Sequence, residues 1–472
     1  MVSFIRQKII KQELLMRVLL ISPKSPVPNV TKREKAINFA RLSLATVAAL
    51  FPEDAEIRII NDNLDGVDFD EKIDLVGITA ITSTAPRAYE IADRFRERGV
   101  PVILGGIHVS ALPEEAALHA DAVVIGEAEG LVQELIDDFK NGKLKKFYRC
   151  IERPSLVNLP LPRKDLLFGN RYYKEFNMIQ TTRGCPFNCD FCSVTNFFGR
   201  TYRQRPIEDV IKEIKQLRRR TIKFIVDDNI AGQPTYAKKF FKALIPLKIK
   251  WFGQGSVIIS RDKELLSLAA KSGCISLYVG FESLSPASLK QVGKSINLLL
   301  DYKEAIKIIH DSGIGIIGAF IFGFDSDDLG VFEETVDFIE RNHIELASFA
   351  ILTPLPGTML YKRMEDNGRI INHDWSKYTC GEVVFRPKLL TVDQLQSGYY
   401  WARKQVSSYR SIIHRTLQPR KSALLYLPVN LIMRKGVRSF LKDPKVSQAT
   451  THFRFRRSAV MKLARKRARE LT

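Results

Sequence analysis

The chain has 472 residues, 45% of them hydrophobic and 26% charged, which is the composition of an ordinary globular protein with room for two or three domains. No apolar run approaches the roughly 20 residues of a membrane-spanning helix, and residues 1–15 lack the apolar core of a signal peptide, so we expect only a short N-terminal extension there. Residues 401–472 hold 19 Lys and Arg against 2 Asp and Glu, so most of the net charge of +21 lies at this end. The charge therefore excludes no class of function for residues 1–400.

Residues 16–144 alternate short β-like runs with helical patterns. The expected strands are Arg17–Ile21, Glu56–Ile60, Asp74–Ile78, Val102–Leu104 and Ala122–Ile125, and the clearest helices are Pro86–Arg98 and Ala128–Asn141. This spacing predicts right-handed crossovers and a Rossmann-like, doubly wound parallel sheet. Ligands of such sheets bind at the carboxyl ends of the strands.

Small and polar residues follow three of these strands, where a planar ligand could approach the backbone. The succession Gly-Gly-x-His-x-Ser at 105–110 and Val-Ile-Gly-Glu-x-Glu at 124–129 resembles the cobalamin-binding domain fused to many radical S-adenosylmethionine (SAM) enzymes. The resemblance places cofactor contacts at Thr82, Ser83, Thr84, Gly105, Gly106, His108, Gly126 and Glu127. For His108 a purely structural role is an alternative. The loop after the first strand, Ser22–Val30, has no His, which implies that no histidine from it would ligate cobalt.

Residues 145–175 are rich in Pro and charge and are expected to be a linker. From 176 to 372 the alternation resumes, with expected strands at Met178–Thr182, Lys223–Val226, Lys250–Gly255, Ser276–Gly280, Gly315–Phe322 and Leu346–Leu352 and helices such as Pro206–Arg218 and Leu299–Ser312. Six such units predict a partial (β/α)6 barrel with its chemistry at the strands' C-terminal ends. A small cap at 373–412 and a helical basic tail at 413–472 would follow.

Three of the six cysteines share one loop: Cys185, Cys189 and Cys192. The spacing C-x3-C-x2-C is one ligand short of a closed tetrahedral zinc site or a fully ligated cubane cluster. Cys150, Cys274 and Cys380 are scattered, so no disulfide framework is expected, and unpaired thiols indicate a reducing cytoplasm.

This loop, with Phe191 before the third cysteine, resembles the cluster loop of the radical SAM superfamily, in which a 4Fe–4S cluster keeps one iron open for SAM. Polar residues end the next strands of the barrel. By resemblance, Asp227 or Asp228 and Glu282 would contact the cofactor, together with Phe191 and Gln254. Helix N-capping is the alternative for Asp228.

The tail joins an almost wholly apolar stretch, Ala423–Met433, to clusters of Lys and Arg. A segment too short to span a bilayer but bounded by cations suits an anionic membrane surface, and a solvated basic end is the alternative. No RNA-binding motif accompanies the charge, so nucleic acid is not an expected partner.

Together these resemblances imply a cobalamin-dependent radical SAM enzyme, similar to hopanoid 2-methylases and anaerobic magnesium-protoporphyrin ester cyclases. Such enzymes cleave SAM to a 5′-deoxyadenosyl radical and need an external electron donor of the flavodoxin or ferredoxin type. C-methylation of an unactivated carbon, with a lipid or isoprenoid substrate, is the favoured reaction, while cyclisation stays open. A tRNA methylthiotransferase would need a second cysteine trio before Cys150, which is absent. A non-catalytic cobalamin- or lipid-binding protein with a degenerate barrel is the remaining alternative.

Overall fold

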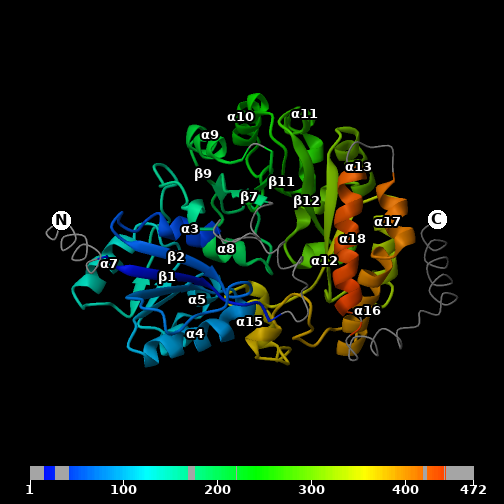
Figure 1. The fold of residues 1–472 in the computed structure, drawn as a ribbon. Coiled ribbons are helices and arrows are strands. Elements are labelled where there is room, and N and C mark those ends of the chain that lie inside the picture. The colour runs from blue at the N-terminus through cyan, green and yellow to red at the C-terminus, as the bar shows by residue number, and fades with distance from the viewer. Residues whose placement is uncertain are drawn as a thin grey trace.

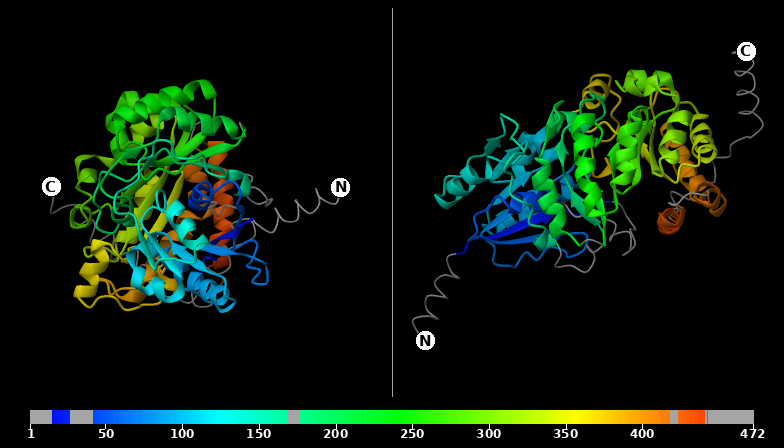
Figure 2. Two further views of the ribbon diagram at one scale, coloured as in Figure 1. Left: turned by 90° about the vertical axis from the view of Figure 1, so that its left-hand side faces the viewer. Right: turned by 90° about the horizontal axis from the view of Figure 1, so that it is seen from above.

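The computed structural model describes residues 15–26, 42–167, 176–218, 220–417, 423–440 and 442. Two six-stranded parallel sheets organise these residues into two lobes that lie side by side (Figures 1 and 2). The predicted α/β class, with a Rossmann-like sheet followed by a partial barrel, is therefore confirmed. The N-terminal extension, part of the first-strand loop and residues 443–472 of the tail lie outside the described residues.

The first sheet has the order β2-β1-β3-β4-β5-β6. Its strands are β1 (Arg17–Ser22), β2 (Glu56–Asn61), β3 (Leu75–Thr79), β4 (Val102–Gly105), β5 (Ala122–Ile125) and β6 (Phe147–Arg149). Its helices are α3 (Leu42–Ala48), α4 (Ala85–Glu97), α5 (Ile107–Ala111), α6 (Pro113–His119) and α7 (Val132–Lys140), with a 3-10 turn η1 (Thr82–Thr84). Separate apolar clusters cover the two faces, as expected for a doubly wound sheet.

Helices α3, α5 and α6 and strand β6 of this lobe were not among the predicted elements. Helix α3 covers one face of the sheet beside β1, and β6 extends the sheet past residue 144 into the stretch expected as linker. Strand β6 has only three residues, too few for an alternating pattern to be visible in the sequence.

The second sheet has the order β14-β13-β12-β11-β10-β7, with a short antiparallel pair β8-β9 beside it. Its strands are β7 (Phe176–Ile179), β8 (Thr182–Arg183), β9 (Arg203–Gln204), β10 (Ile222–Ile225), β11 (Trp251–Gly255), β12 (Cys274–Glu282), β13 (Gly315–Phe322) and β14 (Leu346–Ile351). The helices between them are α8 (Ser193–Phe198), α9 (Ile207–Gln216), α10 (Pro234–Leu244), α11 (Lys263–Lys271), α12 (Pro286–Gln291), α13 (Tyr302–Asp311) and α14 (Val331–Arg341). The largest apolar cluster of the described chain packs these helices against the sheet.

The segment predicted as one strand, Met178–Thr182, is divided between β7 and β8. The buried carboxylate of Asp227 accepts hydrogen bonds from the backbone N–H groups of Thr181 and Thr182, so these residues cannot continue the ladder with β10. The break turns the chain out of the barrel just before the cysteine loop.

Four helices and a short turn follow the barrel in the sequence. They are α15 (Met359–Asp366), α16 (Val392–Val406), α17 (Tyr409–Thr416) and α18 (Ala423–Phe440), with a 3-10 turn η7 (Trp375–Lys377) in the cap. Arg415 on α17 and Asn430 on α18 both donate to the backbone carbonyl of Glu345, just before β14. No helix among the described residues is long and apolar enough to cross a membrane.

Candidate functional site

The cysteine loop leaves β8 and runs into α8 at the end of the barrel that faces the first lobe. Gly184 makes this exit possible, because it has φ +91° and a Cβ there would lie 2.0 Å from the carbonyl oxygen of Thr201. The middle of the loop is held by Asp190, whose N–H donates to Val292 and whose carboxylate pairs with Arg363. The protein's own segments at Val292 and Arg363 therefore hold the loop.

The three loop cysteines are half-buried. Burial raises the pKa of the Cys189 thiol to about 12, and burial likewise raises the pKa values of Cys185 and Cys192. No three Cys, His, Asp or Glu side chains of the described residues are grouped closely enough to hold one metal ion. In a cubane cluster each thiolate binds its own iron, so three thiols spread along one loop fit a cluster better than a single ion. Cationic iron would also offset the cost of burying the thiolates.

A lysine that sequence reasoning did not single out lies beside this loop. Lys294 forms an ion pair with Glu282, and both side chains are largely buried. Burial lowers the pKa of Lys294, but the electrostatic attraction of the Glu282 carboxylate and of the Cys189 sulfur outweighs burial and raises it. Gly280 leaves the space for the pair, since a Cβ there would lie 2.3 Å from a carboxylate oxygen of Glu282. The only sequence signal was a Lys twelve residues after that glutamate.

The segment that carries Lys294 rests directly on the cysteine loop. Gly293 has φ +72°, and a Cβ at this position would lie 2.9 Å from the carbonyl oxygen of Asn188. Glu282 itself has a left-handed backbone, φ +65°, where β12 ends. Strained backbone at a strand end beside a ligand loop is typical of functional sites.

The two predicted aspartates have different surroundings. Asp227 is fully buried and accepts from the N–H groups of Thr181 and Thr182 and from the Thr181 hydroxyl. Asp228 accepts one hydrogen bond of 3.2 Å from the N–H of Gly184 and lines a pocket. Burial raises the pKa of Asp228 to about 6. Neither caps a helix, because α10 begins at Pro234 with Gln233 as its N-cap.

The remaining two residues assigned to SAM lie on the same side of the barrel. Phe191 packs its partly buried ring against the barrel core, and Gln254 is a half-buried residue of β11, whose carbonyl accepts from Ile230. Both are compatible with the assigned roles, which rest on resemblance.

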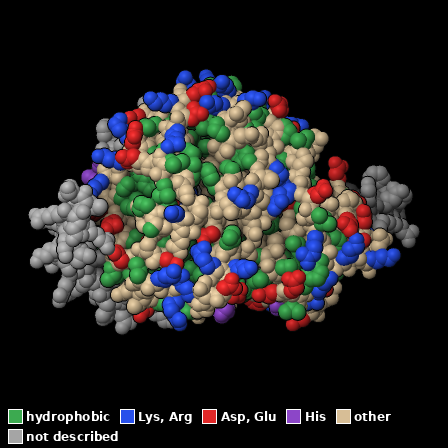
Figure 3. All heavy atoms as spheres, turned by 180° about the vertical axis from the view of Figure 1, so that it is seen from behind, with side chains coloured by type: hydrophobic (Ala, Val, Ile, Leu, Met, Phe, Trp, Pro, Cys, Tyr) green, Lys and Arg blue, Asp and Glu red, His purple; other side chains and the backbone are tan. Residues whose placement is uncertain are grey.

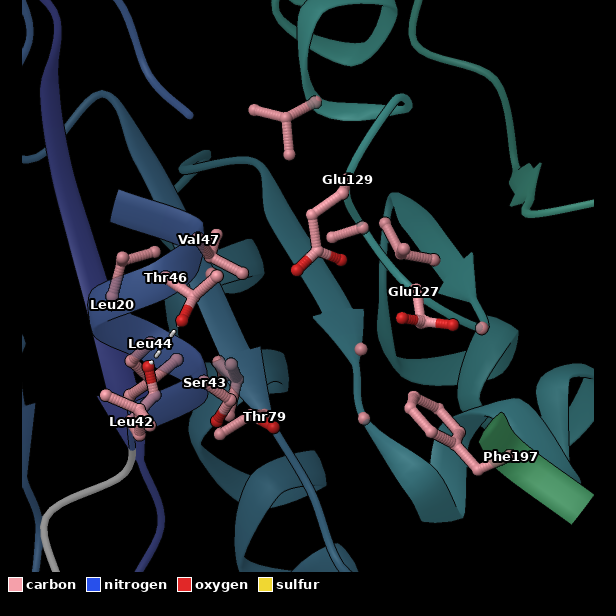
Figure 4. A pocket seen from close by; sticks show the side chains of 18 of the residues that line it. Leu20, Leu42, Ser43, Leu44, Thr46, Val47, Thr79, Glu127, Glu129 and Phe197 are labelled. Carbon is pink, nitrogen blue, oxygen red and sulfur yellow. Dashed lines mark hydrogen bonds between the residues drawn. The ribbon is translucent and has the colours of Figure 1, made fainter. Parts of the chain in front are cut away.

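A pocket of about 620 Å³ opens at the carboxyl ends of the first sheet and reaches the barrel (Figure 4). On the first lobe its wall includes strand, helix and loop residues, among them Leu20, Val47, Thr79, Gly105, Gly106, Gly126 and Glu127. On the barrel side it includes Met178, Gln180, Arg183, Phe197, Phe198, Phe224, Val226 and Asp228. The pocket thus joins the edge of the first sheet predicted to bind cobalamin to the end of the barrel predicted to bind SAM, where Asp228 lines it.

Gly105, Gly106 and Gly126 line the pocket at this edge and form what we call the glycine cradle, where the backbone faces the cavity without side chains. Gly106 has φ +104°, and a Cβ there would lie 2.8 Å from the carbonyl oxygen of Ala80. Gly126 has φ +87°, and its N–H donates to the hydroxyl of Ser110, which in turn donates to the carbonyl of Gly106. A largely apolar cavity with an exposed backbone rim fits a bulky planar cofactor such as cobalamin.

Four of the predicted cobalamin residues lie outside the pocket lining: Thr82, Ser83, Thr84 and His108. Thr84 bonds only back to Ile81 in the turn of η1. His108 is a buried residue of α5, with its Nε2 3.2 Å from the Tyr89 hydroxyl and 3.4 Å from Glu115. Trp375 of the cap donates to the same glutamate, so this cluster joins the cap to the first lobe.

The fold and the two sites define an enzyme class in which a cobalamin-type domain faces a radical SAM barrel. Family models match the same two parts: the B12 binding domain at residues 40–136 and the radical SAM superfamily at residues 179–339. The chain is 32% identical over 84% of its length to the bacteriochlorophyllide d C-12(1)-methyltransferase of Chlorobaculum tepidum, 88% of which is covered. It therefore belongs to the cobalamin-dependent radical SAM enzymes, whose cofactors are a 4Fe–4S cluster, SAM and cobalamin.

Two further similarities agree with this assignment. The chain is 26% identical over 70% of its length to the hopanoid C-2 methylase of Rhodopseudomonas palustris, of which 65% is covered. It shares the fold of the radical SAM methyltransferase TsrM from Kitasatospora setae, solved with cobalamin and a 4Fe–4S cluster, with a TM-score of 0.59, 17% identity and 75% of each chain covered. The predicted family, enzyme class and cofactors are confirmed.

Proposed function

We propose that this enzyme transfers a methyl group to an unactivated carbon of an apolar, ring-bearing small molecule. The observation that carries the proposal is the continuous pocket between the glycine cradle and the cysteine-loop end of the barrel. Its barrel side has three aromatic rings, those of Phe197, Phe198 and Phe224. Aromatic walls favour flat, conjugated or polycyclic substrates over extended polar ones.

A chlorin-type tetrapyrrole is the substrate that we favour. The bacteriochlorophyllide methyltransferase is similar over more of the chain, and at higher identity, than the hopanoid methylase. The lipid or isoprenoid substrate favoured by sequence alone becomes the alternative.

The chain's own residues have the following proposed roles. Cys185, Cys189 and Cys192 hold the cluster, while Asp228 and the Glu282–Lys294 pair flank the space beside it, where a zwitterionic cofactor would find charges of both signs. The cradle at 105–106 and 126 positions cobalamin, and the aromatic wall excludes water from the substrate. When bound, the three cofactors supply the reducing electron, the hydrogen-abstracting radical and the methyl group. An external flavodoxin- or ferredoxin-type donor completes the proposal.

The test is a substrate comparison with enzyme reconstituted with cluster and cobalamin. Bacteriochlorophyllide d and a hopanoid are incubated separately with SAM and a chemical reductant, and products are analysed by mass spectrometry for the gain of one CH2. We expect methylated chlorin from the wild type and none from Cys185→Ala. Methylation of the hopanoid alone would replace the tetrapyrrole by the lipid, and an oxidised ring without added carbon would replace methylation by cyclisation.

We also propose that the outer faces of α17 and α18 contact an anionic membrane surface. The two helices pack side by side, with the guanidinium of Arg434 3.8 Å from the ring centroid of Tyr409. Five large apolar side chains on them are exposed: Tyr409, Ile413, Leu417, Leu431 and Met433. The sequence has no Asp or Glu from 394 to 442 but ten Lys and Arg, so this surface is complementary to anionic lipid headgroups.

The face of the molecule seen from behind differs from this surface, because Asp and Glu lie among its Lys and Arg (Figure 3). Co-sedimentation with phosphatidylglycerol vesicles tests the proposal: wild type should bind them more tightly than phosphatidylcholine vesicles. Ile413→Asp with Leu417→Asp should weaken that binding, whereas Leu389→Asp, an exposed leucine elsewhere, should not. Equal binding of all variants would contradict it.

A further inference from the structure

Four buried charges join the two lobes at the edge of the pocket. The guanidinium of Arg183 donates to Glu127 and to Glu129, in both cases at 2.5 Å, and Arg203 donates to Glu127 at 2.6 Å. The side chains of Arg183, Glu127 and Glu129 are 7%, 2% and 8% exposed. Two acids and two bases balance, so the network is neutral as a whole.

The partners come from the two loops assigned to different cofactors. Glu127 and Glu129 follow Gly126 in the loop after β5, which forms part of the cobalamin cradle (Figure 4). Arg183 ends β8, two residues before Cys185, and also lines the pocket. One guanidinium thus spans from the cobalamin loop to the start of the cluster loop.

Burial makes this connection stiff. A carboxylate taken out of water is tolerated only if it keeps a charged partner, and removing one partner of such a pair costs far more than losing an exposed salt bridge. A movement of either loop would separate Arg183 from at least one glutamate and leave a charge unpaired in a dry environment. The two loops are therefore expected to shift together or not at all.

We propose that Arg183 is a positioning residue that couples the two cofactor sites, so that an ordered cluster loop tightens the binding of cobalamin. Coupling of this kind is reciprocal, and bound cobalamin then stabilises the loop that holds the cluster. The proposal rests on the proposed placement of the two cofactors and is independent of the substrate.

The experiment measures hydroxocobalamin affinity by its visible absorption, in the same protein before and after cluster reconstitution. Wild type should bind more tightly with the cluster, by about 5- to 150-fold as is typical of coupled sites. In Arg183→Gln this ratio should fall to near one. Arg183→Lys keeps one charge but cannot bond both carboxylates in the same way, so it should give an intermediate ratio, and it replaces Arg183→Gln if that variant does not fold.

The chain offers a matched control inside the barrel. Glu213 bridges Lys164 at 2.5 Å and Arg205 at 2.6 Å, a buried triad of the same kind that touches neither cofactor loop. Glu213→Gln should keep the wild-type ratio. A wild-type ratio of one, an unchanged ratio in Arg183→Gln, or an equal loss in Glu213→Gln would each overturn the coupling. Loss of cobalamin or iron binding from the wild type would instead contradict the cofactor placement.

Discussion

The different surroundings of Asp227 and Asp228 lead to a sharp prediction. Asp227 accepts three buried hydrogen bonds, two of them from backbone N–H groups. Asp227→Asn replaces charge-assisted bonds by neutral ones and turns a donor toward the Thr181 hydroxyl, which we expect to cost about 2–4 kcal/mol of unfolding free energy. At about 2–4 °C per kcal/mol for a lobe of this size, the thermal midpoint should fall by roughly 5–15 °C.

Asp228→Asn should behave in the opposite way. The substitution weakens one long hydrogen bond, from the N–H of Gly184. It also removes the free-energy cost of burying a carboxylate charge, the cost that raises the pKa of Asp228 to about 6. We expect its midpoint to change by no more than about 4 °C, the equivalent of about 1 kcal/mol. The affinity for SAM should instead decrease, because Asp228 is the aspartate that faces the pocket.

The assay compares thermal melts of the cluster-free variants with SAM binding by equilibrium dialysis after reconstitution. Two results would refute the reasoning. One is an Asp227→Asn protein that melts like wild type but no longer binds SAM. The other is an Asp228→Asn protein that is destabilised as strongly as Asp227→Asn.

Three further predictions concern Gly105 in the cradle, Lys294 beside the cysteine loop, and the buried carboxyl of Asp327. Gly105→Val should leave the fold intact, since a Cβ there meets nothing closer than 3.8 Å, but it should abolish cobalamin absorption by filling the pocket; retained binding would contradict the cradle. Lys294→Met leaves the Glu282 carboxylate buried without its partner, so we expect the unfolding free energy to decrease by about 3–5 kcal/mol in a thermal melt and SAM to bind more weakly. Adding Glu282→Gln to this variant should restore the stability but not the binding of SAM. Asp327 is buried in the loop after β13, where it accepts from the N–H groups of Gly323 and Phe324. Burial raises the pKa of Asp327 to about 7, above its unfolded value, so the unfolding free energy should decrease as pH rises toward 7. An Asp327→Asn protein with the same pH-dependent melting as wild type would contradict this.

The sequence was informative wherever a feature is local. Apart from β6, the strands of both six-stranded sheets appear close to their predicted positions, because each is a short apolar run bounded by turn residues. The cysteine loop needs only its own spacing to be recognised. The bend at Thr181, by contrast, depends on a carboxylate 46 residues away, and no local pattern reports it.

Side-chain direction was the information that the sequence lacked. His108 follows the two cradle glycines, yet its side chain is buried against Tyr89 of α4 and does not line the pocket. Lys294 reaches the cysteine loop only because two glycines remove the Cβ atoms that would otherwise stand in the way. The contacts of such residues can be assigned only when the three-dimensional positions of the distant segments that face them are known.

The arrangement of the two sheets explains why one pocket can serve both cofactors. Ligands bind at the carboxyl ends of parallel strands, and here the ends of β3, β4 and β5 face those of β7 and β10 across the same space. Each lobe alone would expose its charges at this edge to water. Together they bury Glu127 and Glu129 against Arg183, so the charges that close the pocket also fix the distance between the loops that line it. The distance between the two cofactor loops is therefore set by the interface between the lobes and not by either lobe alone.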